Sequence, residues 1–182
     1  MSEPLLPASG RFEGGTHVFP VRTYFEDCDP AGIVYHANYL RFAERARTEM
    51  MRALGVTHVG MLRTGVAFAV RRCEIDYLRP ARLEEALEVR TRIIDIRGAT
   101  LDAEQIVRRP DAPRNGPPDG ADLPPDHAFA HAHDDEAGEG DMVRLFLRLA
   151  CVNQNGRPVR IPSDVRTAID RHQTSTASSR QS

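Results

Sequence analysis

The 182-residue chain contains no lysine and no tryptophan, and it has only three cysteines. All 24 basic residues are therefore arginines, so any phosphate contact must come from guanidinium groups or backbone amides. The cysteines (Cys28, Cys73 and Cys151) are widely spaced and form no CxxC pair, which fits reduced thiols. The sequence also lacks a basic-then-apolar leader and a run of roughly 18 apolar residues, the length of a membrane span. We therefore expect a cytoplasmic protein.

A strong excess of either charge is also missing. The formal net charge is -2 and the sequence pI is near 6.4, so no basic surface for nucleic acid or an anionic membrane is expected. Hydrophobic residues make up 41% of the chain, enough for one core of ordinary size at this length. The default interpretation is a single domain.

Three segments have little apolar periodicity. Residues 1–16 are rich in proline and glycine, and residues 172–182 are mostly small and polar, so both ends are expected to be flexible tails around a domain at 17–171. Residues 109–141 hold six prolines, four glycines and nine acidic residues against two arginines. Such a segment buries too little apolar surface to offset the entropy of ordering, and it is predicted to be a disordered surface insertion.

The remaining chain alternates between strand and helix patterns. From 38 to 54, apolar residues recur every three or four positions, which predicts a long helix ended by Gly55. Shorter helices are expected at 57–63 and 163–171. Predicted strands, read from apolar residues at every second position, lie at 21–26, 66–78, 87–93, 101–107 and 143–151. One strand, a long helix and four further strands indicate an α+β domain, with an antiparallel sheet around one helix.

The most informative run is 25–39, which reads Phe-Glu-Asp-Cys-Asp-Pro-Ala-Gly-Ile-Val-Tyr-His-Ala-Asn-Tyr. Asp29 and His36 flank a tight turn that opens the long helix. A carboxylate there can act as nucleophile or general base, and a helix N-terminus offers free N–H groups to a developing oxyanion. The residues alone leave another interpretation open, because aspartate before proline is common in turns and the histidine could simply bond locally.

This run resembles the hotdog-fold acyl-CoA thioesterases of the 4-hydroxybenzoyl-CoA thioesterase family. Together with the Glu-Arg-Ala-Arg-Thr-Glu-Met run at 44–50, it is most similar to the Tol-Pal system-associated acyl-CoA thioesterases. The resemblance covers about 17–108 and 142–171, and the 109–141 insertion departs from it. It implies a hotdog fold, in which the sheet wraps around one long central helix, and hydrolysis of an acyl-CoA or acyl-carrier-protein thioester.

The resemblance also implies roles for single residues. Asp29 takes the position of the catalytic carboxylate, while the His36 backbone N–H polarises the carbonyl and the His36 ring is a second catalytic group. Tyr35 and Arg97 are the predicted substrate-binding residues; Arg97 precedes Gly98 at a strand turn, where related enzymes contact coenzyme A phosphates. No cofactor or metal is expected, because coenzyme A is part of the substrate. A homodimer or dimer of dimers with sites at the subunit interface is implied, with an envelope or fatty-acid-synthesis partner.

Other polar residues also allow alternative interpretations. Cys28 lies beside two carboxylates, which raise the pKa of its thiol and make it a poor nucleophile. A second hotdog subclass carries its carboxylate on the long helix, where Glu44 and Glu49 lie, but ion pairs of Glu44 with Arg47 and of Arg45 with Glu49 are simpler. A metal cluster in the insertion fits no stringent zinc spacing; its candidate ligands are His127, His131, His133, Asp134 and Asp135.

Two alternative functions remain. The hotdog hydratases keep their Asp and His about five positions apart around an Asn-Pro, whereas His36 lies seven positions after Asp29, which disfavours hydration. A non-catalytic acyl-thioester binding or envelope adaptor protein, using the acidic insertion as a contact, is the rival. The sequence does not distinguish a nucleophilic from a general-base role of Asp29, and it leaves the acyl group open.

Overall fold

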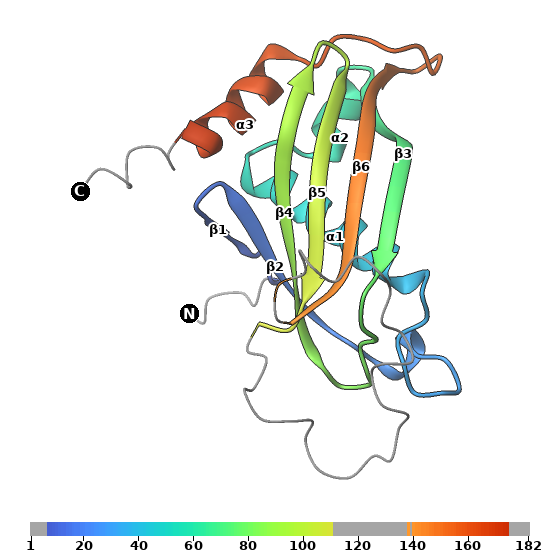
Figure 1. Ribbon diagram of the computed structural model, residues 1–182. Helices are drawn as coiled ribbons and strands as arrows, with labels where there is room; N and C mark the ends of the chain where they lie inside the picture. The colour runs from blue at the N-terminus through green and yellow to red at the C-terminus, as the bar shows by residue number, and fades with distance from the viewer. Residues whose placement is uncertain (1–6, 111–137, 139, 175–182) are drawn as a thin grey trace, which may run out of the picture.

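The computed structural model describes residues 7–110, 138 and 140–174, which form one antiparallel sheet with helices packed against it (Figure 1). The strands are β1 (Arg11–Glu13), β2 (Thr16–Arg22), β3 (Val66–Tyr77), β4 (Ala86–Arg97), β5 (Thr100–Arg108) and β6 (Asp141–Asn153). Their order across the sheet is β1-β2-β4-β5-β6-β3, and every neighbouring pair is antiparallel. The helical elements are η1 (Phe25–Asp27), α1 (Asn38–Ala53), α2 (His58–Arg63) and α3 (Ser163–Thr174). The predicted α+β architecture is confirmed.

The central helix α1 lies along one face of the sheet (Figure 1). Ala43 and Ala46 are fully buried, and their small side chains let the helix backbone approach the strands closely. Phe42 and Met50 fill the space on either side of them. Full burial of a side chain the size of phenylalanine contributes about 1.5–3 kcal/mol. No helix among the described residues is long and apolar enough to cross a membrane.

Strand β6 follows the predicted periodicity closely, whereas β3 is exposed over most of its length, including Cys73. In β6, Val143, Leu145 and Leu147 face the core, whereas Phe146 and Arg148 face outward. Gly98 adopts φ 50° in the tight turn between β4 and β5, and Gly55 adopts φ 79° just after α1. The helix predicted at 38–54 and the short helix predicted at 57–63 are both confirmed.

The first strand lies earlier than predicted. The sequence pattern extended it to residue 26, but β2 ends at Arg22, and Phe25 belongs to the 3₁₀ turn η1 with 84% of its surface exposed. The chain turns here because the Asp27 carboxylate accepts the Tyr24 N–H at 2.9 Å, and Thr23 bonds to the segment before β4 instead of extending a strand. An alternating pattern does not reveal such a cap.

The two ends of the domain are more ordered than the sequence predicted. Residues 11–13, placed in a loose tail, pair with β2, and the closing helix runs three residues past its predicted end to Thr174. The Phe12 ring stacks on His172 with centroids 4.5 Å apart, so the two ends support each other. Residues 1–6 and 175–182 lie outside the described residues, so the tails predicted there stay predictions.

The insertion predicted at 109–141 joins β5 to β6, and residues 111–137 and 139 lie outside the described part of the chain. Its two boundary residues are placed within the domain. Arg109 donates its backbone N–H to Gly140 at 3.0 Å, and Asp141 is buried as the first residue of β6. Arg109 and Asp141, the predicted ends of the insertion, therefore belong to the domain, and the disorder predicted for the residues outside the described part stays a prediction.

The strand register shows which residues lie at each of the two ends of the sheet. At one end, Tyr77 of β3 lies opposite Val143, which lies opposite Val107 of β5. Arg97 lies opposite Thr100 at the β4–β5 turn, which is at the other end. Figure 1 shows this turn at the top of the sheet. The loop before α1 belongs to the Tyr77 end.

Candidate active site

Asp29 begins a tight turn within loop 27–37. Its backbone N–H donates to the Ile33 carbonyl at 2.9 Å, and its own carbonyl accepts the Gly32 N–H at 2.9 Å. Gly32 has φ 76°, a conformation that favours glycine. One carboxylate oxygen, Oδ1, accepts the Ala31 N–H at 2.8 Å. The turn role is thus real, yet among the described residues no hydrogen bond is made to Oδ2, which leaves that oxygen available for chemistry.

Backbone hydrogen bonds hold the rest of the loop. Tyr35 donates its N–H to the Asp27 carbonyl at 2.9 Å, and Val34 donates to the Ala81 carbonyl at 2.8 Å. The buried Asn38 side chain adds a bond from Nδ2 to the same Asp27 carbonyl, also at 2.9 Å. The loop is therefore tied on one side to η1 and on the other to the segment before β4.

The His36 amide lies just before α1 in a position suited to bind an oxyanion. The Tyr35 carbonyl accepts the Asn38 N–H at 2.8 Å, so it points toward the helix. In a planar trans peptide the following N–H points the opposite way, so the His36 N–H is directed away from the helix. It donates no hydrogen bond within the described part of the chain, and the positive end of the α1 dipole lies behind it.

The His36 ring is exposed and lies among tyrosines. Its centroid is 4.2 Å from the Tyr35 ring and 6.3 Å from the Tyr77 ring. Tyr77 donates its hydroxyl to the His36 carbonyl at 3.1 Å. Burial raises the pKa of Tyr77, which keeps this donor protonated. Within the described residues neither a hydrogen bond nor an ion pair joins Asp29 to His36, so the two side chains act separately.

Tyr77 is a functional candidate that sequence reasoning missed. The sequence places it in the strand predicted at 66–78 and gives it no role in the site. The strand pattern placed it correctly, but nothing in the sequence shows that its hydroxyl reaches across 41 residues to His36. The available signal in the sequence was a tyrosine near the end of a predicted strand.

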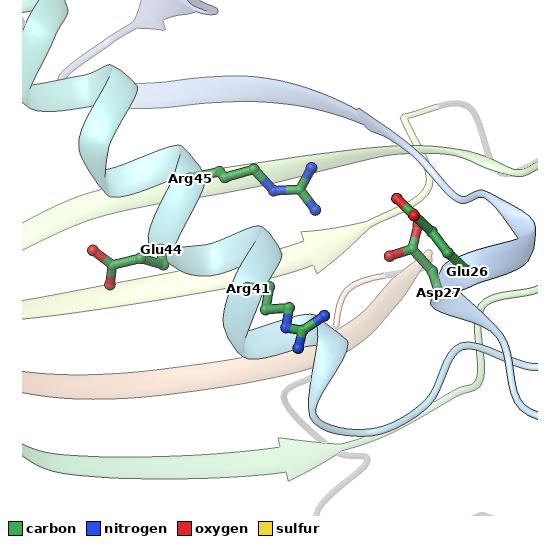
Figure 2. A pocket seen from close by; sticks show the side chains of 5 residues that line it. All are labelled: Glu26, Asp27, Arg41, Glu44 and Arg45. Atoms are coloured by element: carbon green, nitrogen blue, oxygen red, sulfur yellow. The ribbon is translucent and has the colours of Figure 1, made fainter.

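A cavity of about 450 Å³ lies beside the loop, between η1 and the first turns of α1. Figure 2 shows the Arg41 and Arg45 side chains projecting from α1 toward Glu26 and Asp27, while Glu44 points away. Arg45 also lies over the Phe42 ring, 5.3 Å from its centroid. The predicted Arg45–Glu49 ion pair is therefore wrong: Glu49 pairs with Arg52 at 3.4 Å instead.

Beneath α1 lies a second, smaller and more apolar cavity of about 60 Å³. It is lined by residues of α1, α2 and four strands: Glu44, Arg47, Met50, Met51, His58, Phe68, Val70, Ile93, Leu101, Ala103 and Leu149. Arg47 is its buried polar element. Its guanidinium pairs with Glu44, as predicted, and donates to Gln105 Oε1 at 2.5 Å. The Glu44 carboxylate is thus engaged with arginine and does not lie at the loop.

Arg97 lies apart from the other predicted site residues. It is exposed, its guanidinium pairs with Asp95, and it occupies the β4–β5 turn at the far end of the sheet. One chain therefore brings together Asp29, Tyr35 and His36 but not Arg97. No property of a single sequence shows which end of a sheet a turn will occupy.

The other predicted thiol and metal features have clear positions. Burial is the main cause that raises the pKa of the Cys28 thiol, with the charges of Asp27 and Asp29 adding to it, which agrees with a poor nucleophile. No group of three or more histidines, cysteines or acids is placed to hold a metal within 7–110, 138 and 140–174. The insertion histidines lie outside those residues, so a metal-free site stays a prediction.

Comparison with known proteins agrees with the geometry. Residues 24–169 match the family model described as the thioesterase-like superfamily. The acyl-CoA thioester hydrolase YbgC of Escherichia coli O6:H1 is 47% identical over 83 residues, 46% of this chain and 62% of its own length. The acyl-CoA thioesterase YbgC of Haemophilus influenzae is 47% identical over 92 residues, 50% of this chain and 68% of its own. The chain therefore aligns with under two thirds of the E. coli relative.

Solved structures extend the match to the whole domain. The probable thioesterase from Bartonella henselae is 30% identical, with a TM-score of 0.62, over 81% of this chain and 99% of its own. The chain has the hotdog fold, and it belongs to the thioesterase-like superfamily. Its relatives include the YbgC acyl-CoA thioesterases, which confirms the resemblance read from the motif.

Proposed function

We propose that the protein hydrolyses the thioester bond of an acyl-CoA, or of an acyl-carrier-protein, to a free acid and a thiol. One observation carries the proposal: among the described residues, the His36 N–H at the start of α1 and Oδ2 of Asp29 make no hydrogen bond, and both belong to one loop held by backbone hydrogen bonds. The relatives named acyl-CoA thioester hydrolase or acyl-CoA thioesterase support the reaction class.

In this proposal the thioester carbonyl binds at the His36 N–H. One backbone donor of this kind contributes on the order of 10²–10³ in rate. Asp29 Oδ2 either attacks the carbonyl, expelling the thiolate and forming an anhydride that water then hydrolyses to the free acid, or removes a proton from an attacking water, after which the tetrahedral intermediate expels the thiolate. The exposed His36 ring assists, and the Tyr35 ring beside it contacts the substrate.

We also propose that two copies associate through β3. This strand is the sheet edge, it is 12 residues long, and it exposes Val70 at 50%. A long unpaired edge is a template for pairing with a second copy. Antiparallel pairing of the two β3 edges reverses one sheet, so the partner's β4–β5 turn would lie toward the loop 27–37 end. This supports Arg97 as a phosphate contact from the second subunit.

The decisive experiment is thiol release from a panel of short, long and aromatic acyl-CoAs, comparing the wild type with Asp29→Asn. Hydrolysis that collapses in the variant supports both the reaction and its carboxylate, and the ranking of substrates defines the acyl class. Hydrolysis that survives in Asp29→Asn contradicts the role of Asp29. An absence of release combined with tight acyl-CoA binding would instead support the acyl-thioester binding protein.

The compartment, the thiol carrier and the protein partner can also be tested. We propose a cytoplasmic enzyme, with acyl carrier protein as an alternative thiol carrier and an envelope or fatty-acid-synthesis protein as partner. A panel that includes acyl-pantetheine and acyl-carrier-protein separates the carriers by their kcat/KM values. Deleting 111–139 tests whether the insertion contacts a partner. Hydrolysis is expected to survive the deletion, whereas binding of a partner that contacts the insertion is expected to be lost.

A further inference from the structure

Segment 80–85, between β3 and β4, supports the loop that carries His36. Ala81 is fully buried, and its carbonyl accepts the Val34 N–H at 2.8 Å. Its own N–H donates to the Tyr39 hydroxyl of α1, also at 2.8 Å. Burial raises the pKa of Tyr39 to about 12, so this hydroxyl stays uncharged. The Ala81 backbone thus joins α1 to Val34, which lies two residues before His36.

The same segment is held at its other end by Thr23, the residue after β2. The fully buried Thr23 donates its N–H to the Glu85 carbonyl at 3.0 Å and accepts the Glu85 N–H on Oγ1 at 2.8 Å. Glu84, the residue before Glu85, has φ 65°, a left-handed conformation that residues other than glycine rarely adopt. A segment with such a residue keeps its shape only while the surrounding contacts hold it.

Arg109 contacts both ends of this segment. Its Nε donates to Glu85 Oε2 at 3.0 Å and its Nη2 to Oε1 at 2.9 Å, a bidentate pair. Nη2 also donates to the Pro80 carbonyl at 3.3 Å. The Arg109 backbone is fixed in turn by its bond to Gly140, beside the start of β6. One guanidinium therefore fastens both ends of segment 80–85 to the β5–β6 pair.

We propose that Arg109 is a positioning residue for thioester hydrolysis, acting through Glu85 and segment 80–85 on the placement of the His36 amide. The inference rests on the proposed function. Arg109 itself touches no reacting atom, so its contribution is geometric. A misplacement of about 1 Å at a reacting group costs on the order of 10² in rate, and release of one anchor among several is expected to cost less.

The first test is Arg109→Gln with kcat and KM measured separately. We expect kcat to fall about tenfold and KM to change less than about twofold, because geometry and not binding is altered. Arg109→Lys is expected to be intermediate, since lysine keeps the charge but lacks the planar fork.

Arg148→Gln is the matched control. Arg148 makes the same bidentate pair with Asp102, at 2.7 Å for both bonds, on the outer face of the sheet. We expect it to lower the melting temperature by a similar amount and to leave kcat unchanged. An equal loss of kcat in both variants, or in neither, would overturn the positioning role.

Coupling and amide exchange complete the test. If Arg109 acts through Glu85, then Arg109→Gln combined with Glu85→Gln loses no more kcat than the larger single loss, whereas additive losses contradict the inference. Hydrogen exchange at the Val34 and Tyr35 amides is expected to accelerate in Arg109→Gln and not in Arg148→Gln. This readout needs no turnover, so it tests Arg109 even if the wild type releases no thiol and the proposed function fails.

Discussion

Loop 27–37 and the interface between α1 and the sheet are held together by different kinds of contact. The loop is fixed mostly by main-chain hydrogen bonds, such as Tyr35 to Asp27 and Val34 to Ala81. The interface depends on buried side chains, above all Phe42 and the small Ala46. A loop whose shape is set by its backbone leaves its side chains free for chemistry, so substitutions in the two regions should have opposite consequences.

The sharpest test of this contrast is Asp29→Asn. Asparagine keeps an Oδ1 that can accept the Ala31 N–H, so the turn should survive and the free energy of unfolding should change by less than about 1 kcal/mol. Loss of the base or nucleophile should lower kcat by roughly 10²- to 10⁴-fold. Steady-state kinetics and chemical denaturation measure both quantities. A large loss of stability with little loss of kcat would assign Asp29 to the turn alone.

Phe42→Ala should show the reverse. Removing a fully buried ring from the centre of α1 leaves a cavity and is expected to cost about 3–5 kcal/mol of unfolding free energy. The kcat per folded molecule should fall far less than in Asp29→Asn, because Phe42 reaches loop 27–37 through packing on Tyr39, with ring centroids 6.0 Å apart, and the described backbone hydrogen bonds of the loop remain. Denaturation curves give the loss, and active-site titration corrects for the folded fraction. A specific fall in kcat at full folding would show that the two regions are coupled.

The same contrast explains what the sequence could predict. Periodicity predicted α1 and the strands β3 to β6, because burial on one face leaves a regular pattern, and the residue run at 25–39 predicted Asp29 and His36. The sequence pattern could not predict that Asp27 caps η1 and turns the chain. Nor could it show Tyr77 reaching His36 or Arg97 lying at the far end of the sheet. These depend on which distant segments meet, and no local pattern records that.

Tyr77→Phe tests a point where a strand of the sheet does touch the loop. The ring can stay packed against His36 and Tyr39, while the hydroxyl bond to the His36 carbonyl is lost. A hydrogen bond of this kind contributes about 1 kcal/mol, so kcat should fall roughly fivefold with little change in KM or melting temperature. If KM rises at constant kcat, the hydroxyl contacts the substrate and does not orient the loop.

The smallest effect is expected for a substitution on the outer face of the sheet, which serves as a reference for loop 27–37 and for the interface between α1 and the sheet. The Arg148 guanidinium lowers the pKa of Asp102 below its ordinary value of 3.8, chiefly through their hydrogen bonds. A lowered folded pKa means that the pair stabilises the fold above about pH 4, and that this contribution disappears as the pH falls through the lowered value. Asp102→Asn should therefore lower the melting temperature by less than about 4 °C at pH 7, and the difference from wild type should vanish in stronger acid. Thermal melts from pH 7 to pH 2 measure it, with kcat at pH 7 expected to be unchanged. A fall in kcat would mean that a charge pair remote from loop 27–37 reaches the site through the sheet, and the separation between loop and framework would then be incomplete.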